Sequence, residues 1–164
     1  MLCLDVRSSR CGFAVFDDPD RLIDFGITSY AGQQGRLGSM VRKVFHRLVH
    51  LHSPSLVVFR LPPRHGDKRN DRSKMAVKIL RTEAGRQSIP MRFLGRDRIK
   101  RFFKAHGLSN KKLIASYLAR RFPNLESRVP SSRKKWQPEK QGMCLFDAVS
   151  AAVLVRSEGE GQAL

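Results

Sequence analysis

Two acidic residues, each inside an apolar segment and close to opposite ends of the chain, constrain its fold most. Asp5 interrupts the run LCLDV at 2–6, and Asp147 lies in the apolar run 143–155. A carboxylate that is buried in such a segment loses its hydration, so it needs a cation or a hydrogen-bond donor beside it. Either the two acids meet in space and share a cation, or each one caps a helix or pairs with an arginine.

The charge of the chain favours an anionic partner. Lys and Arg number 32 against 14 for Asp and Glu, which gives a net charge of +18 over 164 residues and a pI near 11.0. Such an excess is typical of nucleic-acid binding. No apolar run reaches the roughly 18 residues of a membrane span, so we expect no membrane association.

The three cysteines, Cys3, Cys11 and Cys144, are odd in number and lie in apolar sequence. They predict buried thiols in a reducing cytoplasm, near the nucleoid if the source is bacterial.

Strand-like and helix-like segments alternate along the chain. Three short strands with tight connections predict an antiparallel meander, and strands and helices alternate after it. The expected strands are 2–6, 12–16, 22–27, 56–59 and 89–94; the expected helices are 37–51, 73–85, 96–106, 109–121 with Ser109 as its N-cap, and 141–156. This order predicts an α/β mixed sheet with helices on both faces, in one domain over 1–156 with a flexible tail at 157–164.

The chain resembles the RuvC-like Holliday-junction resolvases of the ribonuclease H-like superfamily. The segment LCLDVRSSRCGFAV at 2–15 is similar to their first hairpin, and PSLVVF at 54–59 to their fourth strand. Residues 75–118 resemble the elements that follow, and FDAVSAA at 146–152 resembles the final helix. The resemblance implies a five-stranded mixed sheet and a Mg²⁺-dependent (or Mn²⁺-dependent) endonuclease, with Lys100 near the scissile phosphate.

The acidic motif of that family is incomplete in this chain. The resemblance implies four acids, of which Asp5 and Asp147 match two. Arg60 stands where a glutamate is expected, Cys144 where an acid or histidine is expected, and Arg7 where a glycine is expected.

Another acid would have to complete a metal site. Two ions held roughly 3.5–4 Å apart need shared carboxylates, and two acids hardly suffice for a pair. Glu139 precedes the last helix and is the best candidate for a third ligand, ahead of Glu83 and Asp17. Alternatively, Glu139 only complements the dipole of the last helix. Arg60 could also take the place of a metal ion, and this replacement would make the domain a nucleic-acid binder and not a nuclease.

Basic residues without nearby acids predict phosphate contacts, although a run of charge is often only a solvated surface. Trp136 beside them either stacks on an unpaired base or anchors a loop. The predicted nucleic-acid-binding residues are Arg7, Arg60, Lys68, Arg69, Arg72, Arg96, Arg98, Lys100, Arg133, Lys134, Lys135 and Trp136.

Three functions stay open at this point. The first is a metal-dependent endonuclease on branched or structured DNA, which would be a homodimer because a four-way junction is two-fold symmetric. Its catalytic residues would be Asp5, Asp147, Glu139 and Lys100, with the first three as metal ligands. The second is a nucleic-acid-binding protein on the same fold with a degenerate catalytic site. Such a protein could be a subunit of a larger assembly. The third is an RNA-processing nuclease.

Overall fold

A five-stranded mixed sheet forms the centre of the protein. A computed structural model describes residues 1–18, 21–30, 36–61, 69–131 and 142–160. The strand order is β3-β2-β1-β4-β5, in which β1 pairs antiparallel with β2 and parallel with β4. The strands are β1 (Leu2–Val6), β2 (Arg10–Asp18), β3 (Arg21–Ser29), β4 (Val57–Arg60) and β5 (Met91–Leu94). The predicted meander and mixed sheet are confirmed.

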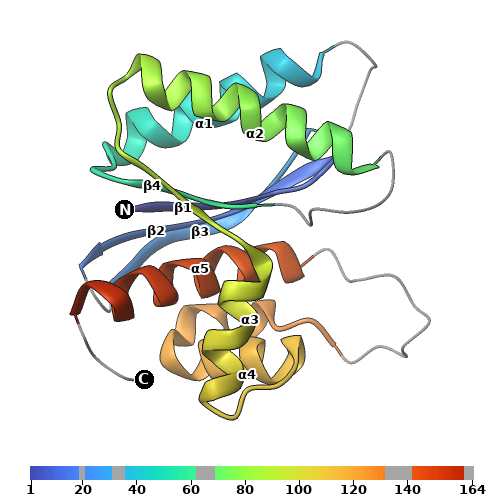
Figure 1. The fold of residues 1–164 in the computed structure, drawn as a ribbon, viewed down its shortest axis with the longest axis vertical. Helices are drawn as coiled ribbons and strands as arrows, with labels where there is room; N and C mark the ends of the chain where they lie inside the picture. The colour runs from blue at the N-terminus through green and yellow to red at the C-terminus, as the bar shows by residue number, and fades with distance from the viewer. Residues whose placement is uncertain (19–20, 31–35, 62–68, 132–141, 161–164) are drawn as a thin grey trace.

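Helices cover both faces of this sheet (Figure 1). The helices α1 and α2 lie on one face, and α5 lies on the other with α3 and α4 beyond it. Their bounds are α1 (Leu37–His52), α2 (Arg69–Arg86), α3 (Arg96–Ala105), α4 (Lys111–Arg121), the 3₁₀ helix η1 (Pro123–Arg128) and α5 (Met143–Glu160).

The position of α5 explains its unusually apolar sequence. Every residue from Met143 to Val155 is buried, because α5 packs on β1 and β2 and is itself covered by α3 and α4. A helix that is apolar all round belongs in such a central layer. By contrast, α1 buries a single stripe that faces the sheet and α2, formed by Leu37, Val41, Phe45 and Leu48.

Several predicted boundaries differ from the structure, among them three at helix ends. The helix α2 begins at Arg69 instead of Ser73, because its first turn is polar and carries no apolar periodicity. The N-cap of α4 is Asn110 and not Ser109: the Asn110 side chain accepts a hydrogen bond from the Leu113 amide at 3.0 Å. The helix α5 continues to Glu160, so the first part of the predicted tail is helical.

Candidate functional site

Asp5 and Asp147 meet at the end of the parallel strands. Asp5 lies one residue before the end of β1, and its register partner on β4 is Arg60. Asp147 lies in the first turns of α5. Both acids are buried, with relative exposures of 1% and 8%, as the sequence predicted. Two acids 142 positions apart in the chain therefore form one cluster near the start of α5.

A glycine on β2 lets α5 come this close to the sheet. Gly12 is the register partner of Asp5, and a Cβ atom on it would lie only 2.1 Å from the carbonyl oxygen of Cys144. No real Cβ tolerates that distance from a backbone atom, so only glycine fits here. The close packing of α5 on β2 brings Asp147 within reach of the same side chains as Asp5.

Three cationic side chains hold the two carboxylates. Arg7 bridges them, donating from Nε to Asp5 Oδ2 at 2.7 Å and from Nη2 to Asp147 Oδ2 at 2.6 Å. Arg60 also contacts both, with Nη1 2.5 Å from Asp5 Oδ1 and Nη2 3.6 Å from Asp147 Oδ2. The Lys111 ammonium donates to Asp147 Oδ2 at 2.8 Å. The cluster therefore carries three positive charges against two negative charges.

Burial and ion pairing act in opposite directions on the pKa values of this cluster. Burial alone would raise the pKa of Asp147, but the charges of Arg60, Lys111 and Arg7 together lower it below its ordinary value. Burial would likewise lower the pKa of Arg60, and the carboxylates of Asp5 and Asp147 raise it instead. Both groups are thus ionised at neutral pH, and the cationic neighbours hold Asp147 in that form despite its burial.

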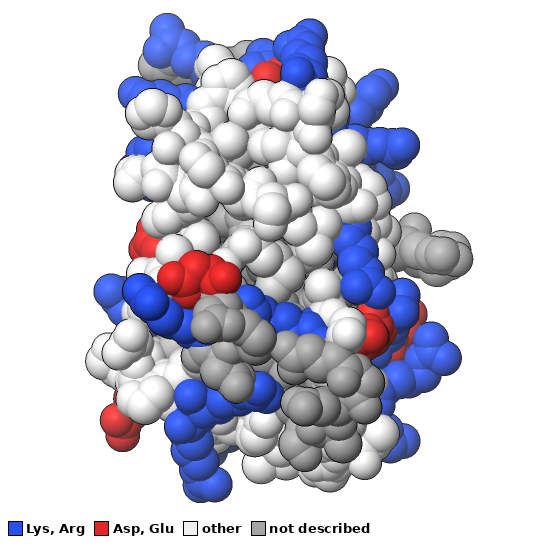
Figure 2. All heavy atoms as spheres, turned by 90° about the vertical axis from the view of Figure 1, so that its left-hand side faces the viewer, with Lys and Arg blue, Asp and Glu red and all other residues white. Residues whose placement is uncertain are grey.

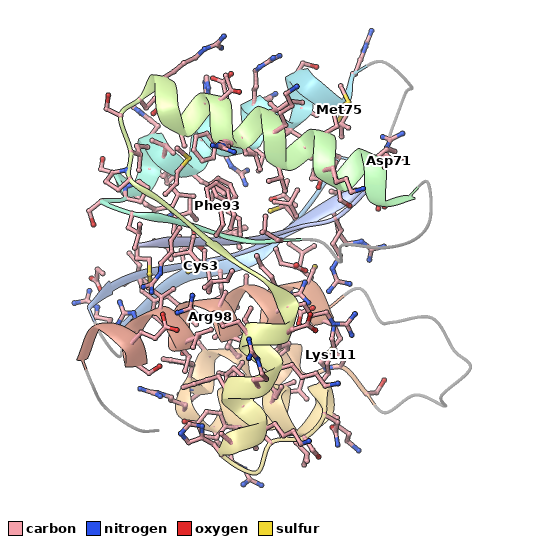
Figure 3. The ribbon with its side chains drawn as sticks, in the orientation of Figure 1. Cys3, Asp71, Met75, Phe93, Arg98 and Lys111 are labelled. Atoms are coloured by element: carbon pink, nitrogen blue, oxygen red, sulfur yellow. The ribbon has the colours of Figure 1, made fainter. Side chains whose placement is uncertain are left out.

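Lys111 and Tyr30 are site residues that the sequence reasoning missed. Lys111 is the first residue of α4, and Figure 3 labels it near the start of α5. Nothing in the sequence distinguishes it from the other lysines. Tyr30 is buried, and its hydroxyl hydrogen-bonds to the backbone carbonyls of Arg7 and Arg10, the latter at 2.7 Å. It thereby braces the β1–β2 turn from which Arg7 reaches the acids.

The donor set does not fit the metal pair that the resemblance implies. Both oxygens of Asp5 already accept hydrogen bonds from guanidinium groups, and the cluster has a net positive charge, which repels a divalent cation. Cys144 stands where the resemblance implies an acid or a histidine. Burial raises the pKa of its thiol to about 11, so the thiol is protonated at neutral pH and is a poor ligand for a hard cation. Within the described residues, no group of three or more His, Cys, Asp or Glu side chains is arranged to hold a metal ion.

The remaining candidate acids do not join this cluster where the structure describes them. Glu139 lies outside the described residues, so its predicted role as a ligand stays a prediction. Glu83 is buried between α1 and α2, where it pairs with Arg42 at 3.1 Å and with His46 at 2.9 Å. Asp17 pairs with Arg21 on the next strand.

The predicted basic contacts divide into several groups. Arg96 and Lys100 are exposed on α3, and both line a cavity beside Asp147. Arg98, on the same helix, instead pairs with Glu158 at 2.7 Å. Arg72 is half-buried on α2, and Arg69 begins that helix. Outside the described residues lie Lys68, Arg133, Lys134, Lys135 and Trp136.

Basic residues also lie away from this site. Figure 2 shows the side of the molecule opposite the labelled Lys111, and Lys and Arg occur there along the upper rim, on both flanks and across the lower half. Acidic residues also appear on this face, most plainly left of its centre and near its right edge. The net charge of +18 is therefore spread over several faces. Among the described helices, none is long and apolar enough to cross a membrane.

Comparisons with known proteins agree on the fold. No protein-family model matches the sequence, and no curated protein matches it significantly. Among solved structures, Thermus thermophilus RuvC in complex with a Holliday junction substrate matches with a TM-score of 0.70 and 16% identity, over 98% of this chain and 96% of that chain. Another Thermus thermophilus RuvC structure matches with a TM-score of 0.67 and 16% identity, over 98% and 97%.

A eukaryotic resolvase shares the same architecture. The yeast mitochondrial Holliday junction resolvase Ydc2 matches with a TM-score of 0.60 and 12% identity, over 97% of this chain and 80% of that chain. Identities this low bear on architecture and not on activity. The chain has the ribonuclease H-like fold of the RuvC and Ydc2 resolvases, built around a pair of acids that arginine and lysine side chains neutralise.

Proposed function

We propose that this protein binds branched or structured DNA through a resolvase-like fold and does not cleave it. The observation that carries the proposal is the pairing of Asp5 and Asp147 with three cationic side chains, at distances of 2.5–2.8 Å for the closest contacts. In this cluster Arg60 takes the structural role of a metal ion: it neutralises both carboxylates and joins β4 to α5. The net charge of +18 supports a nucleic-acid partner.

A metal-dependent endonuclease is the second candidate, and the closeness of Asp5 to Asp147 favours it. In that case Glu139 would complete the metal shell of Mg²⁺ or Mn²⁺, and Lys100 would contact the scissile phosphate. The arginines would have to leave the carboxylates before a metal could bind. Since that exchange replaces buried ion pairs, metal affinity would be low.

Titration with Mn²⁺, followed by electron paramagnetic resonance, separates these two functions. The positive control is the triple variant Arg7→Gly, Arg60→Glu, Cys144→Asp, which restores the residue types that the resolvase resemblance implies. We expect the triple variant to bind Mn²⁺ and the wild-type protein to show no saturable binding. Stoichiometric Mn²⁺ binding by the wild type that disappears in Asp5→Asn would overturn the proposal.

Binding and cleavage are measured on the same substrates. A labelled four-way junction, a linear duplex of equal length and a hairpin RNA are incubated with the protein, in EDTA and in Mg²⁺. We expect tightest binding to the junction in both buffers, with the strands intact. Cleavage in Mg²⁺ alone would support the nuclease, and failure to bind any of the three substrates would contradict both functions.

A homodimer remains part of this proposal. A four-way junction has two-fold symmetry, which a dimer with two equivalent binding surfaces would match. Light scattering of the protein alone and of its complex with the junction tests this point: we expect two chains for each junction, and one chain for each junction would contradict the dimer.

A further inference from the structure

A cavity beside the carboxylate cluster is lined by both apolar and cationic side chains. It lies between α3, α4 and α5 and has a volume of about 220 Å³. Arg60 and Asp147 form part of its wall, so it adjoins the cluster described above. Cavities that bind whole drug-sized ligands usually measure roughly 300–1,000 Å³, so this one suits a single ring system with its substituents.

Part of the cavity wall is apolar, beside the buried polar side chains of Arg60, Asp147 and Ser150. Ile99, Met143 and Phe146 line it and are all buried, with relative exposures of 5%, 8% and 1%. Ile114 of α4 completes this part and is only half-buried, so it presents apolar surface to the cavity. A flat ring bound here would remove this apolar surface from water. The ring could also stack on the aromatic side chain of Phe146.

Another part of the cavity wall is cationic. Arg96 and Lys100 stand four residues apart on α3 and therefore lie on one side of that helix. Neither has an ion-pair partner among the described residues, in contrast to Arg98 between them, which pairs with Glu158. Lys111 lines the same wall and lies 2.8 Å from Asp147. Ser109 and Asn110 add polar side chains at this end of α4.

We propose that this cavity takes one unpaired nucleotide of a bound nucleic acid, with the base in the apolar part and the adjoining phosphate on Arg96 and Lys100. Only an unstacked base would fit, because the cavity is too small for a base pair. Branched and bulged DNA present such bases at low energetic cost. This inference rests on the proposed function, and it assigns the preference for structured substrates to one pocket.

The test compares two bulged duplexes that differ in a single base. One carries a one-nucleotide bulge with 2-aminopurine, and the other carries an abasic nucleotide at the same position. Their phosphates are the same, so the difference in affinity reports the base alone. We expect the base-containing bulge to bind roughly tenfold more tightly, and the 2-aminopurine fluorescence to rise on binding because the base leaves the stack.

Two matched variants locate the effect in the cavity. Ile114→Trp fills the apolar part, while Leu113→Trp adds the same side chain at the neighbouring position, which is 43% exposed and does not line the cavity. We expect Ile114→Trp to abolish the preference for the base-containing bulge and Leu113→Trp to keep it, with similar melting temperatures for both. The fluorescence change in the wild type is independent of how either variant folds.

Failure of this inference is distinguishable from failure of the proposed function. Equal affinity for the two bulges with no fluorescence change, in a protein that still binds four-way junctions, would overturn the nucleotide pocket alone. Loss of all nucleic-acid binding in the wild type would overturn the proposed function as well.

Discussion

Asp5 and Arg60 are register partners on two neighbouring parallel strands, and their side chains form an ion pair of 2.5 Å between Oδ1 and Nη1. The two side chains have relative exposures of only 2% and 8%. A charge buried to this degree is tolerated because its partner is present, and each therefore depends on the other. This pair stands where the resolvase resemblance implies two carboxylates that share metal ions.

Removal of Arg60 is expected to destabilise the fold strongly. Arg60→Met would leave Asp5 with Arg7 as its cationic partner, so we expect a loss near the lower end of the roughly 3–5 kcal/mol found for broken buried pairs. The double variant Asp5→Asn, Arg60→Met should lose less than the sum of the two single variants. Urea unfolding of the four proteins measures this coupling.

A surface pair serves as the control for that cycle. Lys74 and Asp71 are 3.5 Å apart and exposed, so Lys74→Met should change stability by less than about 0.5 kcal/mol. If the losses of Asp5→Asn and Arg60→Met add without coupling, the two side chains do not stabilise each other as described.

The stability of the protein is expected to fall in acid because of Asp147. Its folded pKa lies below the ordinary value, since Arg60, Lys111 and Arg7 outweigh the effect of burial. The unfolded chain therefore binds more protons than the folded chain below about pH 4, and the free energy of unfolding decreases as the pH falls through the folded pKa. Urea unfolding at several pH values between about pH 6 and about pH 2.5 measures how steeply the free energy of unfolding depends on pH.

The variant Asp147→Asn isolates this contribution. Its overall stability should be lower, because three cations lose a partner, but its stability should depend less on pH over the same range. Equal slopes for the wild type and Asp147→Asn would assign the acid sensitivity to other carboxylates.

The sequence predicted the elements well and the ion pairs poorly, for physical reasons. Periodicity and turn residues locate elements such as β1 and α1, because these signals are local. The contact between Arg7 and Asp147 spans 140 positions and depends on how closely α5 packs on β2. Patterns of burial predicted that Asp5 and Asp147 need a cation or a hydrogen-bond donor. They could not decide between a metal ion and Arg60, since both satisfy that need.

The salt dependence of DNA binding should identify the phosphate contacts. Arg96 and Lys100 are exposed, and neither forms an ion pair within the described part of the chain, so a bound phosphate costs no existing interaction. Replacing Lys100 with Gln should make the dependence of log K on log salt concentration shallower, by about 1 in the magnitude of its slope. Arg98→Gln should lower it less, because Arg98 is held by Glu158 at 2.7 Å. Fluorescence anisotropy at several salt concentrations gives these slopes, and equal slopes for both variants would contradict this division.

Gly12 tests whether the site depends on the close packing of α5. A Cβ atom at this position would lie 2.1 Å from the Cys144 oxygen and 2.7 Å from the Leu145 nitrogen, and neither backbone atom can move without moving the helix. We expect Gly12→Ala to cost about 1–3 kcal/mol of stability or more, as for other overpacked cores. Gly85→Ala is the matched control, because nothing lies within 4 Å of its added Cβ on α2. The control should be neutral or up to about 1 kcal/mol more stable, since alanine favours a helix. Similar losses for the two variants in urea unfolding would show that α5 can shift without cost, and the meeting of Asp5 with Asp147 would then not depend on Gly12.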